Sequence, residues 1–405
     1  MYIKKVVCIM FVIIISMQMT ACDYIDAIKE GILETEETTA VRSTVAPLQK
    51  GSYTPVEETS YRMRNLLTDN QKSAYEKIER AVFYMDDNAS LGKVTIDDVS
   101  LAYNAVMDDY PQYFWMSKEY SYLASSNGNM KIFFKNNNGK SNTDYLVSEE
   151  QREGMQQKFN AAVQKALGKL TVGMSEYERE LVLHDYLVEN VTYDQATADE
   201  TKEDNLSYTA YNALVTGTAV CDGYTRAYQL LLYYAGIENG LVYGTADKIG
   251  HIWNVVKING KWYHVDSTWN DTSDAGYHAY FNVTDNYIKA DHEIGKENMS
   301  LPVCNSTERN YGVVNKTYIT SNAEFETVIK EAMKRSIPKG INKLQFIFGE
   351  NYNRTLPEDL AKFSSTYIEP VIKQYNKEVE KKYRVKEFWV GGIKGSKAFL
   401  LEKNE

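Results

Sequence analysis

The chain has 405 residues, of which 43% are hydrophobic and 25% are charged, and its formal net charge is −10. This length exceeds one ordinary domain, so we expect at least two folded units, each able to bury a core. The acidic balance argues against nucleic acid or an anionic membrane surface as an electrostatic partner, and it leaves neutral or basic peptides open.

The N-terminus has the pattern of a secretory leader. Two lysines precede the apolar run Val6 to Ile15, which is about half the roughly 20 residues that a helix needs to cross a bilayer. The run leads to Met19-Thr20-Ala21-Cys22, and small residues just before a cysteine resemble a bacterial lipobox. We therefore predict a lipoprotein signal peptide at 1–21 and lipidation of Cys22, with acyl chains anchoring the protein on the extracellular face of the membrane. An ordinary secretory signal with Cys22 as a spectator is the alternative.

The positions of the four cysteines indicate whether the protein depends on disulfide bonds. Cys8 falls in the predicted leader and Cys22 at the lipidation site, so Cys221 and Cys304 remain as thiols. This distribution argues against a disulfide framework, and we expect these two cysteines to be free rather than bridged. Loss of the leader removes two lysines and changes the net charge from −10 to −12.

The region before the core divides into a tether and an extension. Residues 22–60 are polar and predict a flexible membrane-proximal linker. Residues 61–170 predict a helical and β-hairpin extension that serves as a packing scaffold. Its expected helices and strands are a helix capped by Asp69 and running to Met85, a helix beginning at Thr95, strands at Met130–Lys135 and Asp144–Val147, and a helix from Ser148 to Leu167.

The predicted core, residues 171–300, contains a cysteine in a position that suits a nucleophile. A capping box at Ser175 to Glu178 opens the helix Glu176–Glu189. Further on, Cys221 ends a small-residue loop and begins a helical pattern that stops at Gly236. The positive end of the helix dipole and the unpaired amide groups of the first turn both favour a thiolate there.

Downstream, a hairpin places a base next to a carboxylate. His251 to Ile258 predicts a strand, and Asn259-Gly260 is a strong two-residue turn signal before the next strand. This turn pairs Ile258 with Lys261, so paired numbers sum to 519 and Trp253 faces Asp266. Because side chains alternate, His251 and Asp266 then project from one face as diagonal neighbours.

A nucleophile, a base and an orienting carboxylate are thereby available. The imidazole would take the thiol proton while the carboxylate fixes its tautomer. The spacing alone does not bring Cys221 to His251. His264 shares the predicted face and competes for Asp266, although we favour His251. We expect Trp253, Trp262 and Trp269 to fill core rather than roof a site, and His184 to be satisfied locally without a catalytic role.

Three segments together resemble the catalytic motifs of the bacterial transglutaminase-like superfamily: Ala219 to Tyr224, Gly250 to Val256 and Trp262 to Asp271. Their order and spacing match, over about Met174 to Asp291. The resemblance implies an α+β, papain-like core in which a helix carrying Cys packs on an antiparallel sheet carrying His and Asp. It implies that Cys221 is the nucleophile, His251 the general base and acid, and Asp266 the orienting residue.

The rest of the chain offers weaker signals. Tyr277–Val283 predicts a strand, followed by a loop with Asp291-His292. His292 is a weak metal candidate without a second histidine or cysteine at ligand spacing, so we expect neither a metal nor a cofactor.

Residues 301–405 predict a small α/β domain. Its expected features are a capping box at Ser321–Glu324 with a helix to Arg335, a strand at Lys343–Phe348, a helix at Glu358–Lys382, and strands near Phe388–Val390 and Ala398–Leu401, where Phe388-Trp389 fits core better than a ligand shelf.

The motifs and the leader together predict an extracellular, lipid-anchored thiol enzyme. It would act on peptide or glutamine-type amide bonds through a thioester, by hydrolysis or by amine transfer, on a surface or cell-wall peptide or protein. The alternative is a non-catalytic surface binding or scaffold protein that retains the fold. The intact Cys, His and Asp favour the enzyme. The acyl donor, the acceptor and the oligomeric state are left open.

Overall fold

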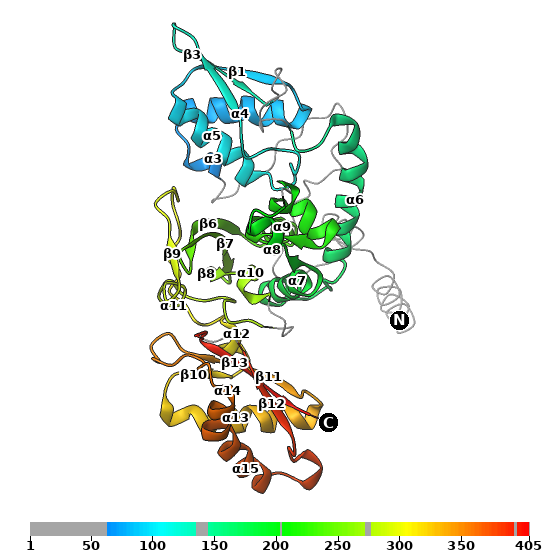
Figure 1. The fold of residues 1–405 in the computed structure, drawn as a ribbon, viewed down its shortest axis with the longest axis vertical. Coiled ribbons are helices and arrows are strands. Elements are labelled where there is room, and N and C mark those ends of the chain that lie inside the picture. Colours follow the sequence, from blue (N-terminus) through cyan, green and yellow to red (C-terminus); the bar gives the residue numbers. More distant parts are fainter. Residues whose placement is uncertain (1–62, 135–144, 203–204, 272–276, 393–394, 405) are drawn as a thin grey trace, which may run out of the picture.

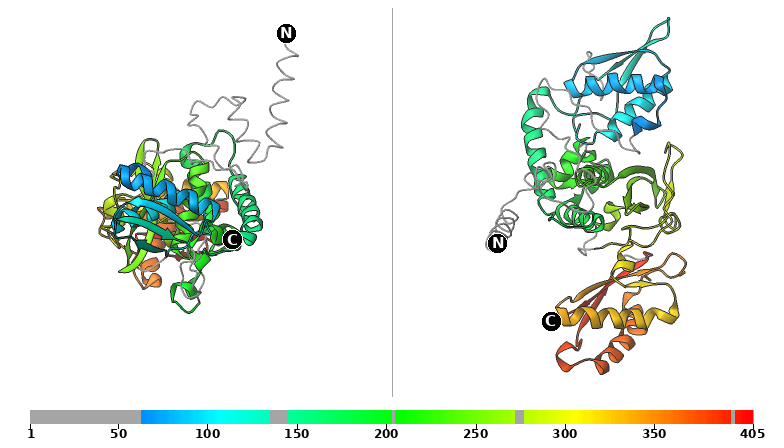
Figure 2. Two further views of the ribbon diagram at one scale, coloured as in Figure 1. Left: turned by 90° about the horizontal axis from the view of Figure 1, so that it is seen from above. Right: turned by 180° about the vertical axis from the view of Figure 1, so that it is seen from behind.

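The computed structural model describes residues 63–134, 145–202, 205–271, 277–392 and 395–404. Three units follow one another along the long axis of the molecule, from the N-terminal unit through a central unit to the C-terminal unit (Figure 1), and the view from behind shows the same order (Figure 2). The predicted signal peptide, Cys22 and the linker lie outside the described residues. Among the helices of the described ranges, none has the length and apolar character needed to cross a membrane.

The N-terminal unit packs helices against a small antiparallel sheet with strand order β1-β3-β2. Its elements are α3 (Met63–Leu66), α4 (Asp69–Tyr84), β1 (Asn88–Lys93), α5 (Ile96–Asp109), β2 (Ser121–Ala124), β3 (Asn129–Phe133) and α6 (Glu149–Leu167). The side chains of Thr95 and Ser148 accept from the backbone of the third helical residue, which explains where α5 and α6 begin. The residue that precedes α4 is Thr68, one position before the predicted cap.

The predicted strand at Asp144–Val147 is wrong for residues 145–147, the part that the structure describes. Leu146 N donates to Trp115 O at 2.8 Å, outside any ladder. The partners of β3 are β1 and β2, two short strands that the sequence pattern did not reveal. Every residue of β2 is exposed, so this strand lacks the alternation of apolar and polar residues that predicts one.

The central unit carries a four-stranded antiparallel sheet in the order β8-β7-β6-β9. Its elements are α7 (Glu176–Asn190), β4 (Thr192–Tyr193), α8 (Gln195–Ala198), the 3₁₀-helix η1 (Asn205–Tyr208), the π-helix η2 (Asn212–Thr216), β5 (Thr218–Ala219), α9 (Cys221–Tyr234), β6 (Asn239–Ala246), β7 (Ile249–Ile258), β8 (Lys261–Val265), α10 (Ser267–Asn270), α11 (Asp285–Ile288) and β9 (His292–Ile294). Buried side chains of α4, α5 and α6 belong to the same hydrophobic cluster as those of α9, so the N-terminal and central units share a core.

The hairpin β7–β8 has the predicted register. Asn259 and Gly260 both have positive φ, 50° and 77°, as a two-residue type I′ turn requires. Ile258 pairs with Lys261 and the ladder continues to Asn254 with Val265, so the sum of 519 holds along the whole pairing. The register places the residue after β8, Asp266, on the face that carries His251.

The segment Tyr277–Val283 is not the strand that the sequence predicts. Of its residues, only Val283 pairs, in a single bridge with His264. Side chains take the place of a ladder: Tyr280 N donates to Asn270 Oδ1, and His278 N donates to Gln345 Oε1, both at 2.9 Å. Gln345 lies 67 positions from His278, so local β propensity could not foresee this partner.

The C-terminal unit is a four-stranded sheet, β10-β11-β13-β12, with helices and a separate hydrophobic cluster. Its elements are α12 (Tyr311–Val314), β10 (Tyr318–Ile319), α13 (Asn322–Ser336), the 3₁₀-helix η3 (Ile337–Lys339), β11 (Lys343–Phe348), α14 (Leu360–Phe363), the π-helix η4 (Ser364–Ile368), α15 (Glu369–Glu378), the 3₁₀-helix η5 (Lys381–Tyr383), β12 (Phe388–Gly391) and β13 (Ala398–Lys403).

Three details of this unit differ from expectation. The predicted helix Glu358–Lys382 is divided into shorter segments, and Pro370, which cannot donate a backbone hydrogen bond, stands at the start of α15. Ser321 makes no side-chain cap; instead Glu324 accepts from the backbone of Thr320. Trp389 is 40% exposed, so the prediction that it fills core is wrong.

Candidate active site

The helix α9 brings its first residue, Cys221, to the strand that carries His251. Two buried hydrogen bonds tie the helix to β7: Thr225 Oγ1 donates to Ile252 O at 2.9 Å, and Asn254 Nδ2 donates to Thr225 O at 3.2 Å. This docking supplies the contact that spacing alone could not establish. Cys221 is half-buried, and both it and Cys304 are free thiols, as expected.

Gly223 allows the first turn of α9 to pack this closely. A Cβ at this position would lie 2.6 Å from the Cβ of Ala219 and 2.7 Å from the carbonyl oxygen of Ser207. We expect Gly223→Ala to displace the turn that carries Cys221 and to destabilise the protein by about 1–3 kcal/mol. Urea unfolding and the rate of Cys221 alkylation measure the two effects. Gly154→Ala is the control, because a Cβ at this exposed helical position meets nothing within 4 Å; equal losses in both variants would contradict the packing argument.

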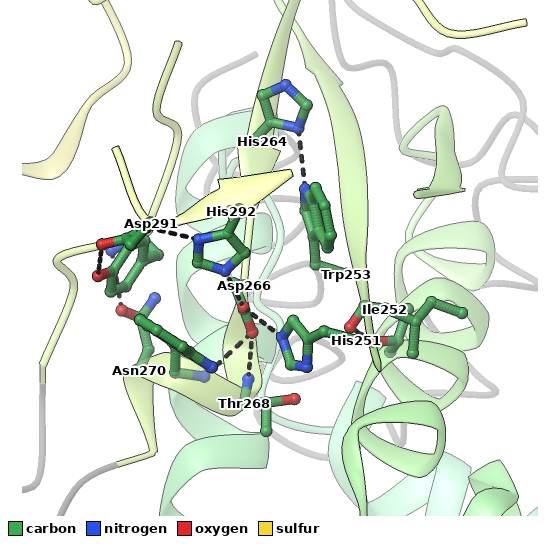
Figure 3. Close-up of polar contacts among 12 residues, drawn as sticks. His251, Ile252, Trp253, His264, Asp266, Thr268, Asn270, Asp291 and His292 are labelled. Carbon is green, nitrogen blue, oxygen red and sulfur yellow. Dashed lines mark hydrogen bonds and ion pairs between the residues drawn. The ribbon is translucent and has the colours of Figure 1, made fainter. Parts of the chain in front are cut away.

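The His251 imidazole and the Asp266 carboxylate are in direct contact (Figure 3). His251 Nε2 lies 2.7 Å from Asp266 Oδ2, and the two side chains are 7% and 1% exposed. Burial alone would lower the pKa of His251, but the charge and hydrogen bond of Asp266, together with the Cys221 side chain as a further hydrogen-bonding partner, raise it to about 10. Since Asp266 occupies Nε2, Nδ1 is the ring nitrogen left for the thiol. The structure thus brings together all three residues predicted from the sequence.

Asp266 is held in place by four hydrogen bonds. Its Oδ1 accepts from the backbone of Thr268 and Trp269, both at 3.0 Å, where it caps α10. Its Oδ2 is shared by His251 at 2.7 Å and His292 at 3.0 Å. Burial opposes ionisation, but the neighbouring imidazoles hold the pKa of Asp266 well below its usual range. The carboxylate is therefore an ionised orienting group.

His292 is the residue of the site that sequence reasoning missed. It lies on β9 rather than in a loop, where it pairs with Ala246 of β6. At Gly244 the two strands approach so closely that a Cβ would lie 2.0 Å from the carbonyl oxygen of Glu293. A glycine inside a strand is the signal of such an approach, but the sequence pattern did not predict β6. Gly244 alone would not have identified His292 as the residue on the neighbouring strand.

His264 does not compete for Asp266. Its Nδ1 accepts from Trp253 Nε1 at 3.0 Å, and its Nε2 lies 2.9 Å from Asp285 Oδ1. Burial, despite the opposing effect of Asp285, lowers the pKa of His264. This imidazole is a neutral structural group. Trp253 is fully buried, as expected, and its ring also lies alongside that of His251 with centroids 6.0 Å apart.

His184 is satisfied only in part by its own helix. Its Nδ1 lies 2.9 Å from Asp185 Oδ1, but its Nε2 accepts from Asn270 Nδ2, which is 86 positions away, at 3.0 Å. The same Asp185 oxygen lies 2.7 Å from His278 Nε2. The hydrogen bonds of His184 lead to Asp185 and to α10, so its role is to support the helix that Asp266 caps.

Three groups of side chains in the described ranges could be considered for a metal: His184 with Asp185 and His278, His251 with Asp266 and His292, and His264 with Asp285 and Cys304. In the second group the nitrogen and oxygen atoms touch at 2.7 and 3.0 Å. Both separations are hydrogen-bond distances, so these three side chains satisfy one another directly through the Asp266 carboxylate.

A cavity of 370 Å³ lies where the N-terminal unit meets α9 and β6. Apolar side chains such as Leu101 and Leu301 line it together with Lys118 and Asp222. Lys118 Nζ lies 3.2 Å from Asp222 Oδ2, and Asp222 is the residue after Cys221. The N-terminal unit therefore contributes to the surroundings of the thiol.

Comparison with known protein families finds a match that covers part of the central unit. Residues 165–267 match the family model of the transglutaminase-like superfamily. The mixture of helices and antiparallel strands in the central unit agrees with the papain-like fold expected of that class.

Individual relatives are distant, and the chain spans only 16% of the length of the curated relatives that it matches. The chain is similar to Kyphoscoliosis peptidase of Homo sapiens and of Mus musculus, with 28% identity over 107 residues in each case. The matched stretch is 24% of this chain and 16% of each relative. A solved structure described as a TGase is 16% identical, with a TM-score of 0.27, and the match covers 39% of this chain and 46% of that one.

Proposed function

We propose that this protein is a transglutaminase-like thiol enzyme that acts on peptide or glutamine-type amide bonds. The observation that carries the proposal is the His251 imidazole, bound to Asp266 on one side with Cys221 as its other partner. An imidazole that takes the proton of a thiol and then gives it to the leaving amine needs this arrangement.

The steps follow from the geometry. The thiol proton of Cys221 passes to His251, and the sulfur attacks the amide carbon. The carbonyl oxygen becomes an oxyanion next to the backbone N–H of Cys221, which belongs to the unpaired first turn of α9. The C–N bond then breaks, the amine leaves with the proton from His251, and a thioester remains. Water resolves it to an acid, whereas a second amine resolves it to a new amide.

Alkylation separates an enzyme from a non-catalytic protein that retains the fold. We expect iodoacetamide near neutral pH to label Cys221 faster than free cysteine, and His251→Ala to abolish that advantage. Mass spectrometry of tryptic peptides measures the extent of alkylation of each cysteine separately. Cys304 serves as the internal control, because it is fully buried and burial raises the pKa of its thiol. A Cys221 that reacts no faster than free cysteine would favour the scaffold protein.

A glutamine peptide, offered with and without a primary amine, distinguishes the two outcomes of the thioester. An amine adduct in the mass spectrum identifies transfer. Cleavage or deamidation without an adduct identifies hydrolysis and excludes transglutamination of that peptide.

We further propose that the enzyme is anchored outside the cell through lipidated Cys22 and acts on surface or cell-wall peptides and proteins. The support is the sequence of the leader and its Ala21-Cys22 junction. Cys22→Ser should prevent incorporation of a labelled fatty acid and release the protein from the membrane fraction. Retention of the label in this variant would contradict the assignment.

A further inference from the structure

One carboxylate oxygen in the site serves two imidazoles. Asp266 Oδ2 lies 2.7 Å from His251 Nε2 and 3.0 Å from His292 Nε2 (Figure 3). Only His251 takes part in the proposed proton transfer. The second imidazole, that of His292, is fully buried and lies on a separate strand, β9. Its contact with Asp266 therefore has a role beyond the proton transfer.

The contacts of His292 fix its protons. Its Nδ1 lies 2.6 Å from Asp291 Oδ1, and its Nε2 faces Asp266. The other oxygen of Asp291 accepts from the hydroxyl of Tyr280 at 2.7 Å. Because an ionised carboxylate only accepts hydrogen bonds, both nitrogens of His292 must donate. The ring between the two carboxylates is therefore an imidazolium.

The surroundings of His292 suit a cation. The rings of Trp269, Trp253 and Tyr280 lie around it, with centroids 4.6, 5.1 and 5.4 Å from its own. Burial opposes the charge, but hydrogen bonds to Asp266 and Asp291 raise the pKa of His292. The titratable groups that face it are Asp266, Asp291, Tyr280, His251 and, beyond Trp253, the neutral His264, while Lys397 acts on Asp291 from the C-terminal unit.

We propose that His292 is a positioning residue, a fixed imidazolium that offsets part of the charge of Asp266 and so limits how strongly Asp266 holds a proton on His251. The inference rests on the proposed function, because it concerns the proton that His251 must take from Cys221 and later release. An imidazolium that is too stable would be a poor acid for the leaving amine. His292 makes that release easier while it keeps Asp266 in place.

Nuclear magnetic resonance of histidine-labelled protein tests the proposal without any turnover. The full chain carries Cys221→Ala, so thiol chemistry does not enter, and its five histidines can be assigned by single substitutions. We expect the His292 resonance to stay in the imidazolium form from pH 5 to 8. His292→Gln keeps a donor for Asp266 but loses the charge. We expect it to raise the midpoint of His251 by roughly one to two pH units, as loss of a unit charge about 6 Å away predicts at an effective dielectric near 20.

Asp291→Asn provides a second route in case His292→Gln does not fold. It leaves His292 in place but removes the anion that keeps it charged, so His292 should titrate and His251 should shift in the same direction by a smaller amount. Asp285→Asn is the matched control, because the partners of Asp285 are His264 and the backbone of Cys304 rather than Asp266 or His251. It should leave His251 unchanged.

The possible outcomes are distinct. A neutral His292 at pH 7, or a His251 midpoint that moves in neither variant, overturns the inference and leaves His292 a purely structural partner. If the midpoints move as expected while Cys221 of the unsubstituted protein shows no enhanced alkylation, the proton distribution stands and the proposed enzyme function fails.

Discussion

Asp266→Asn is expected to reduce acyl transfer by roughly 10³–10⁴-fold, the scale seen when the orienting carboxylate of a catalytic triad becomes an amide. The amide can still accept the backbone hydrogen bonds of Thr268 and Trp269 through its oxygen, so α10 keeps its cap. The amide NH₂ then faces His251 Nε2 and donates to it. This reverses the tautomer, since His251 would carry its proton on Nδ1, toward Cys221, where it has to accept one.

The rate of Cys221 alkylation by iodoacetamide near pH 6 measures this effect directly, and conversion of a glutamine peptide measures it over the whole reaction. Asp285→Asn is again the control, because it makes the same chemical change beside another buried histidine. Full alkylation reactivity in Asp266→Asn would show that the carboxylate does not set the tautomer of His251.

The same substitution should flatten the dependence of stability on pH. The pKa of His251 is raised to about 10 in the folded protein, so its stabilising contribution is complete below its unfolded pKa of about 6.5 and is lost as the pH rises through 10. The pKa of Asp266 is depressed, so its contribution is present above about pH 3.9 and is lost as the pH falls. Thermal unfolding between about pH 2 and about pH 10 should show both losses in the unsubstituted protein and smaller ones in the variant.

The parts of the site that depend on neighbouring residues could be predicted from the sequence. The positive φ angles of Asn259 and Gly260 set the register of the hairpin, and that register alone puts His251 and Asp266 on one face. The position of Cys221 likewise follows from a loop that runs into a helical pattern. The docking of α9 on β7 required the family resemblance, since it depends on hydrogen bonds of Thr225 and Asn254 across the fold.

Long-range pairing explains what the sequence did not reveal. His292 reaches Asp266 because β9 pairs with β6, a strand nearly fifty positions earlier, and nothing within a window around His292 encodes that partner. Tyr277–Val283 has strand-forming residues, yet Asn270 and Gln345 satisfy its backbone instead. The pairing that places His292 and the contact of Gln345 with His278 both join elements far apart in the chain, and single-sequence periodicity cannot register such contacts.

A buried ion pair fixes the N-terminal unit to α9, the helix that begins with Cys221. Arg226 lies on α9, just over one turn after Cys221, and its Nη2 is 3.1 Å from Asp108 Oδ1 at the end of α5. The two side chains are 6% and 5% exposed. Arg226 Nη1 also donates to Met107 O at 2.9 Å, and the hydroxyl of Tyr243 donates to Asp108. Burial opposes the charge of the guanidinium, but Tyr243 and Asp108 raise its pKa, so it stays ionised.

Arg226→Met is expected to destabilise the protein by about 3–5 kcal/mol, because it leaves the carboxylate of Asp108 buried without its cation. For the N-terminal and central units, which share a core, that loss of stability corresponds to a fall in melting temperature of roughly 10 °C. Thermal unfolding followed by tryptophan fluorescence measures it. Arg226→Lys should recover only part of the loss, since an ammonium cannot reach Met107 and Asp108 with the same planar fork.

The double variant Arg226→Met with Asp108→Leu separates the cost of an orphaned charge from the value of the pair. Replacing both partners by apolar groups is often neutral or stabilising, so we expect the double variant to regain most of the stability lost in Arg226→Met. If it remains as unstable as the single variant, the loss comes from the packing and hydrogen bonds of the guanidinium rather than from Asp108. The alkylation rate of Cys221 in the double variant then shows whether the N-terminal unit must be held on α9 for the thiol to react.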